Sequence, residues 1–258
     1  MVASAPAAPA PSYADIADLI VKSPVIADVT IHAVQKVKPR DAVGVKPGKQ
    51  RLLVTATLNN LLRGTQALPK EIQYLIDVPS DAKGHIPKLK KQRVLAFGRP
   101  VSGQSDQIQL TGDNSQQPWN PALDTTTRHI TAEVVDPAAP PEVTGIGNAF
   151  HVPGALPGEG ETQLFLSTTD GRPVSISVLS RPGQPKSWSV ALSEIVDESA
   201  KAPARDTLLW YRLACFLPRA LPAAALASND EGNAAAARED YRFVLQSLGA
   251  CGRTIAAP

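Results

Sequence analysis

The most concentrated group of charged side chains in this 258-residue chain is a basic segment at residues 83–93. It supplies six groups that could bind an anion: Lys83, His85, Lys88, Lys90, Lys91 and Arg93. Such a segment can grip a phosphate backbone, but a solvated basic loop has the same composition. Single-strand recognition also needs aromatic side chains on which bases stack, and the first 110 residues contain only three. Nucleic acid is therefore the less favoured partner.

The second group of interest is the pair of cysteines, Cys215 and Cys251, which could form a covalent bond. An even cysteine count between two predicted helices fits one disulfide in an exported protein, although two buried thiols would also fit. The Ala/Pro-rich start carries Ala3-Ser4-Ala5, which has the small-x-small form of a signal-peptide cleavage site. We therefore expect a periplasmic or secreted protein whose signal peptide is missing from this chain. A cytoplasmic location is the alternative.

Motifs for catalysis, metal binding and cofactor binding are missing from the sequence. The four histidines lie at least 22 residues apart, and no C-x-x-C, G-x-S-x-G or P-loop pattern occurs. Gly145-Ile-Gly147 begins like a dinucleotide fingerprint, but the last glycine of that motif is missing and a Pro-rich run precedes it. We expect no metal, no cofactor and no catalytic residues. A hydrolase would need serine, histidine and acid side chains that converge only in the fold.

Composition and charge indicate a folded protein with an uneven surface. The net charge is only +2, and 43% of the residues are hydrophobic, which argues against extensive disorder. Residues 1–100 contain 15 basic and 7 acidic residues, so the excess of positive charge lies in the first part. No apolar run approaches the roughly 18 residues of a membrane-spanning helix, so we expect no membrane span.

Hydrophobic alternation predicts two regions of β-structure. Five short strands are expected in the first region, at residues 25–34, 52–58, 72–78, 94–97 and 108–110, with a helix after Ser12 and another from Asp124. This pattern is typical of a small, OB-like barrel. A three-stranded meander at residues 163–167, 174–178 and 188–192 follows, covered by two helices at residues 206–217 and 233–248. The predicted fold class is α+β.

These patterns divide the chain into four parts: a flexible tail at residues 1–11, a β-barrel-like domain at residues 12–135, a Pro/Gly-rich linker at residues 136–160 and an α+β domain at residues 161–258. The stretch taken as a linker could also be a strand with irregular ends, because Ile146 and Phe150 lie within it.

The order of elements from residue 13 to residue 110 resembles the secreted OB-like barrels of the tissue-inhibitor and netrin-module type. The segments that carry this resemblance are Leu61-Leu62-Arg63-Gly64 and Val94-Leu95-Ala96-Phe97. This chain has no N-terminal cysteine, so the protease-blocking role of those proteins is not implied. The segment from Asp206 to Pro218 resembles an uncharacterised proteobacterial family.

We expect an exported, non-catalytic binding or scaffold protein, with an envelope protein or ligand as its partner. One alternative is a cytoplasmic, OB-type nucleic-acid binder that uses the 83–93 segment. The other is a hydrolase whose site assembles only in the fold. The sequence does not indicate an oligomeric state.

Overall fold

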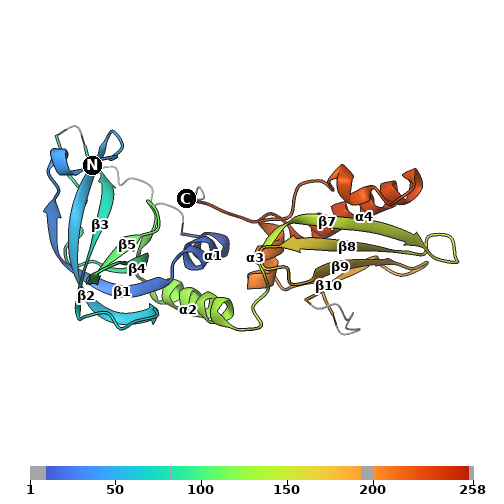
Figure 1. Ribbon diagram of the computed structural model, residues 1–258, viewed down its shortest axis with the longest axis horizontal. Helices are drawn as coiled ribbons and strands as arrows, with labels where there is room; N and C mark the ends of the chain where they lie inside the picture. Colours follow the sequence, from blue (N-terminus) through green and yellow to red (C-terminus); the bar gives the residue numbers. More distant parts are fainter. Residues whose placement is uncertain (1–9, 82, 193–199, 256–258) are drawn as a thin grey trace, which may run out of the picture. The chain divides into compact units, whose positions relative to one another are not determined.

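The computed structural model describes residues 10–81, 83–192 and 200–255. They form two compact units (Figure 1). Of the described residues, those up to Val135 and Arg253–Ile255 belong to the barrel unit, and those from Asp136 to Gly252 belong to the sheet unit. None of the described helices has the length and apolar character needed to cross a membrane.

A closed, mixed β-barrel is the centre of the barrel unit. Its strands are β1 (Val25–Lys36), β2 (Lys49–Arg63), β3 (Glu71–Pro79), β4 (Arg93–Val101) and β5 (Gln104–Leu110). They follow the order β1-β2-β3-β5-β4, and β4 pairs back to β1. A short strand, β6 (Gln116–Pro118), extends the sheet beside β4. Two helices, α1 (Tyr13–Lys22) and α2 (Pro121–Val135), contact each other, and Pro39–Asp41 form a short 3-10 helix after β1.

The predicted alternation fills the barrel. Val25, Ala27, Val29 and Ile31 of β1 lie in the same buried cluster as Ile72, Tyr74 and Val78 of β3. A side chain on every second residue of a strand points to the same face, so each strand supplies one row of this core.

The last residues of the described chain belong to the barrel unit and not to the sheet unit. We call Arg253–Ile255 the C-terminal strap. Its contacts are with α1: Arg253 forms an ion pair with Asp18, and the backbone amides of Thr254 and Ile255 donate to Asp15. The domain expected at residues 161–258 therefore differs from the observed division, because long-range hydrogen bonds hold this end of the chain.

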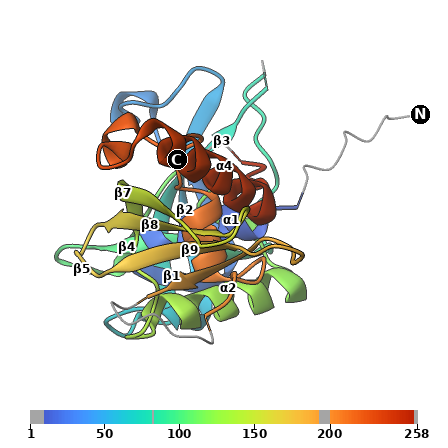
Figure 2. The same ribbon diagram turned by 90° about the vertical axis from the view of Figure 1, so that its right-hand side faces the viewer.

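The sheet unit is an antiparallel meander with helices against it (Figure 2). Its strands are β7 (Val143–Pro153), β8 (Gly160–Thr168), β9 (Val174–Ser180) and β10 (Ser187–Ala191), and its helices are α3 (Leu208–Ala214) and α4 (Glu231–Leu248), with a short 3-10 helix at Ala223–Leu226. The barrel together with this helix-covered meander confirms the α+β fold class.

Residues 136–160 contain more structure than the linker we expected. Val143–Pro153 form β7, which pairs with β8 along most of its length. Two irregularities in this pairing, at Val143/Gly145 and Ile146/Asn148, put Val143, Ile146 and Ala149 on the buried side. Their spacing of three residues hides the strand from a search for period-two alternation.

Candidate functional site

The six basic residues singled out in the sequence lie around the loop between β3 and β4. Two have carboxylate partners: His85 Nδ1 is within hydrogen-bond distance of Asp81 at 2.8 Å, and Arg93 forms an ion pair with Asp28 at 2.7 Å. The hydrogen bonds from the backbone and ring of His85 lower the pKa of Asp81. Within the described residues, no ion pair is recorded for the four exposed lysines, Lys83, Lys88, Lys90 and Lys91. The structure thus separates a set of four lysines from two residues with structural partners.

The cysteine pair lies in the sheet unit. Cys215 and Cys251 form a disulfide, with 4.8 Å between their Cα atoms, that closes a loop of 36 residues. A disulfide is compatible with an exported protein. It joins the residue that follows α3 to a residue just beyond the end of α4.

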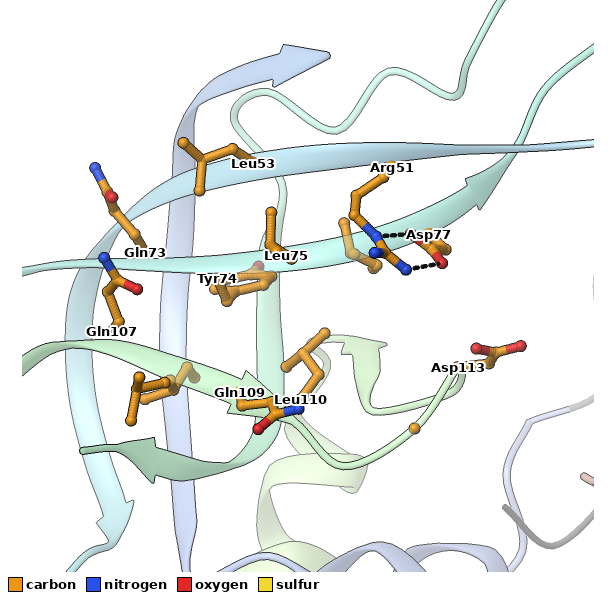
Figure 3. Close-up of a pocket in the computed structure, with 14 residues that line it drawn as sticks. Arg51, Leu53, Gln73, Tyr74, Leu75, Asp77, Gln107, Gln109, Leu110 and Asp113 are labelled. Carbon is orange, nitrogen blue, oxygen red and sulfur yellow. Dashed lines mark hydrogen bonds and ion pairs between the residues drawn. The ribbon is translucent and has the colours of Figure 1, made fainter. Parts of the chain in front are cut away.

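A groove of about 470 Å³ on the barrel is the best-formed candidate binding site (Figure 3). Its walls come from β2, β3, the last residue of β4, β5 and the turn after β5. Gln73 and Gln107 lie close together at one end in the view, Leu53 and Leu75 occupy the middle, and Arg51, Asp77 and Asp113 mark the other end. The groove therefore combines an apolar centre with amide groups at one end and charges at the other.

The groove exists because two neighbouring strands of the barrel separate. β3 pairs with β2 from Glu71 to Pro79, but its parallel pairing with β5 consists of one residue pair, Gln73 with Gln107. Beyond Gln73 the edge of β3 that faces β5 has no continuing ladder. Unpaired strand edges present N–H and C=O groups that another chain can bind.

Ion pairs fix the charged end of the groove. Arg51 donates from Nε and Nη2 to the two carboxylate oxygens of Asp77, at 2.7 and 2.8 Å. This hydrogen bonding raises the pKa of Arg51, although burial opposes it. Asp113 accepts from Lys49 at 2.6 Å and lies 3.5 Å from Lys46, and the hydrogen bond from Lys49 is the main cause of its lowered pKa. These charges are already paired in the protein.

A second hollow of about 350 Å³ lies beside the turn between β4 and β5. The two share Val101 and Gln107 in their linings, and Gln104 and Ser105 line the second. Between them, the two hollows are lined by residues along the length of β5. This arrangement suits an extended ligand better than a compact one.

One residue of β3 indicates this groove in the sequence, although the alternation of the strand does not reveal it. Leu53 and Leu75 are directly paired between β2 and β3. Leu75 occupies the outward register of β3, between Gln73 and Asp77, and is 48% exposed. A large apolar side chain in a row of outward-facing polar ones is an indication of a binding surface.

Within the described residues, no group of three or more His, Cys, Asp or Glu could hold a metal ion. Comparison of the sequence with known protein families and with curated proteins gives no match to either. The resemblances described for residues 13–110 and 206–218 therefore stay predictions.

Proposed function

We propose that this chain is an exported, non-catalytic binding protein whose barrel binds an extended polypeptide segment of an envelope protein in the groove between β3 and β5. The observation that carries this proposal is the interrupted pairing of these two strands beyond Gln73 and Gln107. An added strand would complete the ladder with main-chain hydrogen bonds, and side-chain pockets would give specificity.

The composition of the groove supports a peptide ligand. The glutamine side chains of β3 and β5 carry both donors and acceptors, which match the alternating groups of a peptide backbone. Leu53 and Leu75 offer an apolar contact for one side chain of the ligand.

Features that single-stranded nucleic acid needs are weak in this groove. Tyr74 is the one aromatic residue in its lining, and it is 2% exposed with its hydroxyl donating to Gln116. It cannot act as a stacking platform for bases. The one cation among the described residues of the lining, Arg51, is already bound to Asp77.

The export part of the proposal depends on the disulfide. A bond between Cys215 and Cys251 persists in an oxidising compartment and is rare in the cytosol. Cell fractionation, followed by alkylation with and without prior reduction, tests this part. Free thiols in a cytoplasmic chain would contradict it.

Selection of linear peptides from a displayed random library against the full, disulfide-bonded chain tests the binding part. We expect selected peptides to slow hydrogen exchange at the edges of β3 and β5, because the added strand protects their amides. Leu75→Glu should weaken binding at least about tenfold, since it puts a charge in the apolar centre of the groove.

Leu156→Glu is the matched control, because Leu156 is also an exposed leucine (59%) but lies in the sheet unit. It should leave peptide binding unchanged. Failure to select any linear peptide, or equal binding by wild type and Leu75→Glu, would refute the groove as a peptide site.

The four exposed lysines of the β3–β4 loop support one second candidate, an OB-type nucleic-acid binder. A salt-dependent mobility shift with single-stranded DNA, abolished by Lys90→Glu together with Lys91→Glu, would support this candidate. The absence of a shift at low salt would exclude it.

A further inference from the structure

A third hollow, of about 270 Å³, lies in the sheet unit, where α4 crosses the strands. It is separate from the barrel groove and from the function proposed for it. Its lining includes a histidine, a lysine and a serine together with three carboxylates: His151, Lys186, Ser180, Glu159, Glu239 and Asp240.

A chain of hydrogen bonds behind this pocket fixes the proton on His151. Thr162 is fully buried and donates its one hydroxyl proton to Asp240, at 2.5 Å. Its oxygen must therefore accept from His151 Nδ1, which lies 2.8 Å away. In its neutral form, the imidazole therefore carries its proton on Nδ1 and its lone pair on Nε2.

A glycine makes room for this imidazole. A Cβ atom at Gly160 would lie 2.7 Å from Cε1 and 2.8 Å from Nε2 of His151, so the ring edge rests over a position without a side chain. Within the described residues, no hydrogen-bond partner is recorded for Nε2. The pocket therefore contains an imidazole acceptor whose orientation is set from behind.

The charge of Lys186 is used inside the protein. Its ammonium group donates to Asp240 at 2.6 Å and lies 3.6 Å from Glu239. Burial lowers the pKa of Lys186, but the hydrogen bond and charge of Asp240 outweigh burial and raise it. Asp240 and Glu239 together carry one more negative charge than Lys186 neutralises, so this side of the pocket has an excess of negative charge.

Ser180 does not turn this pocket into a hydrolase site on the geometry observed. It lines the same hollow as His151 and Asp240, but no hydrogen bond joins it to His151 in the described part of the chain. Its hydroxyl is a further acceptor for a ligand.

We propose that this pocket binds a small, primary alkylammonium group. The ammonium donates one hydrogen bond to His151 Nε2, and the carboxylate of Glu239 at the rim balances its charge. A free diamine and a lysine side chain carry the same group and are both candidates.

Two NMR measurements on the full chain test the proposal. A long-range proton–nitrogen spectrum reports which imidazole nitrogen of His151 carries the proton, and we expect Nδ1. In titrations, 1,4-diaminobutane or the amide of Nα-acetyllysine, whose side-chain ammonium is free, should shift the His151 resonances. Tetramethylammonium, which has no N–H donor, should not shift them at matched ionic strength. Binding by the lysine amide alone would identify a side chain as the ligand.

Variants separate binding from structural effects. His151→Phe removes the acceptor but keeps a ring, and should weaken diamine binding by about tenfold to a hundredfold. Thr162→Val should mix the two imidazole tautomers, a spectral change that loss of packing alone would not produce. Glu239→Gln, at an exposed rim position, should weaken binding without affecting the fold, whereas Glu231→Gln on the same helix should leave it unchanged.

A proton on Nε2 of His151 would overturn the proposal. So would equal shifts with tetramethylammonium, or unaltered diamine affinity in Glu239→Gln and His151→Phe.

Discussion

Replacement of Asp28 by asparagine should destabilise the barrel unit by about 3 kcal/mol. The Asp28 side chain is completely buried, and it accepts hydrogen bonds from Arg93 Nε at 2.9 Å and Nη2 at 2.7 Å. Asn59 and Asn60 donate the other two, at 3.0 and 3.2 Å. The side chain of asparagine has the same shape, but it carries no charge and turns an NH2 group towards these donors.

The size of the effect follows from the exposure of the two partners. Removal of one member of a buried ion pair costs about 3–5 kcal/mol, because the other charge is left uncompensated. Arg93 is 40% exposed, so water can solvate the released guanidinium and the cost falls to the lower part of this range. Asp113→Asn removes a half-exposed partner of Lys49 and should cost less than about 1 kcal/mol.

Hydrogen exchange measured by mass spectrometry is the appropriate assay, because it gives opening free energies for separate segments. Peptides from β1 and β4 should lose protection in Asp28→Asn, while peptides from β7 to β9 serve as the internal control. A loss below about 1 kcal/mol, or an equal loss in both units, would refute the argument that this carboxylate stabilises the barrel.

The pH dependence of stability tests independently whether the charged form of Asp28 is the stabilising one. Burial raises the pKa of Asp28, but hydrogen bonds from Arg93, Asn59 and Asn60 outweigh burial and hold the pKa below its ordinary value of 3.8. The contribution of Asp28 to stability is therefore complete above pH 3.8 and is lost as the pH falls through the lower, folded pKa. The difference in stability between wild type and Asp28→Asn should shrink below about pH 4.

Two further predictions concern backbone contacts and the disulfide. Gly98→Ala should destabilise the barrel by about 1–3 kcal/mol, because the new Cβ would lie 2.8 Å from the carbonyl oxygen of Gln109 on β5; urea denaturation measures the loss. Replacement of both Cys215 and Cys251 by serine should lower the stability of the sheet unit by about 4 kcal/mol through the 36-residue loop that they close. Hydrogen exchange in β8 and β9 measures this loss of stability, and unchanged protection of these strands would contradict the prediction.

The sequence predicted those parts of the fold that depend on local periodicity. β3 alternates cleanly, and in β1 the row from Val25 to Ile31 is buried as expected, although Ile26 and Asp28 on its other face are buried too. Both strands were expected at nearly their observed positions. β7 was expected only as the alternative to a linker, because its two irregularities change the spacing of its buried residues. A pattern search assumes an unbroken pleat, which β7 does not have.

The candidate sites depend on contacts that no local pattern encodes. Gln73 meets Gln107 only because β3 and β5 become neighbours when the barrel closes. His151, Thr162 and Asp240 come from two strands and a helix, and 78 residues separate the last two. The sequence contained the residues, but their pairing follows from strand order and helix placement.

The C-terminal strap leads to a final prediction about how the chain is organised. Along the sequence, the sheet unit falls between α2 and the strap. The chain therefore leaves the barrel unit after residue 135 and returns to it at residue 253. The strap serves two buried carboxylates of α1: Arg253 donates to Asp18 at 2.6 and 2.9 Å, and Thr254 donates to Asp15 from its backbone and hydroxyl. Burial raises the pKa of Asp15, but hydrogen bonds from Thr254 and Ser12 outweigh it and lower the pKa.

Deletion of residues 253–258 should therefore destabilise the barrel unit by about 2–3 kcal/mol, because both carboxylates lose their charge-assisted partners while water reaches only part of each site. Exchange should accelerate in α1 and stay unchanged in β8 and β9. Equal acceleration in both units would show that the strap stabilises the chain as a whole. Unchanged exchange in α1 would show that Ser12 alone satisfies Asp15. It would also show that the return of the chain to the barrel unit adds nothing to the stability of that unit.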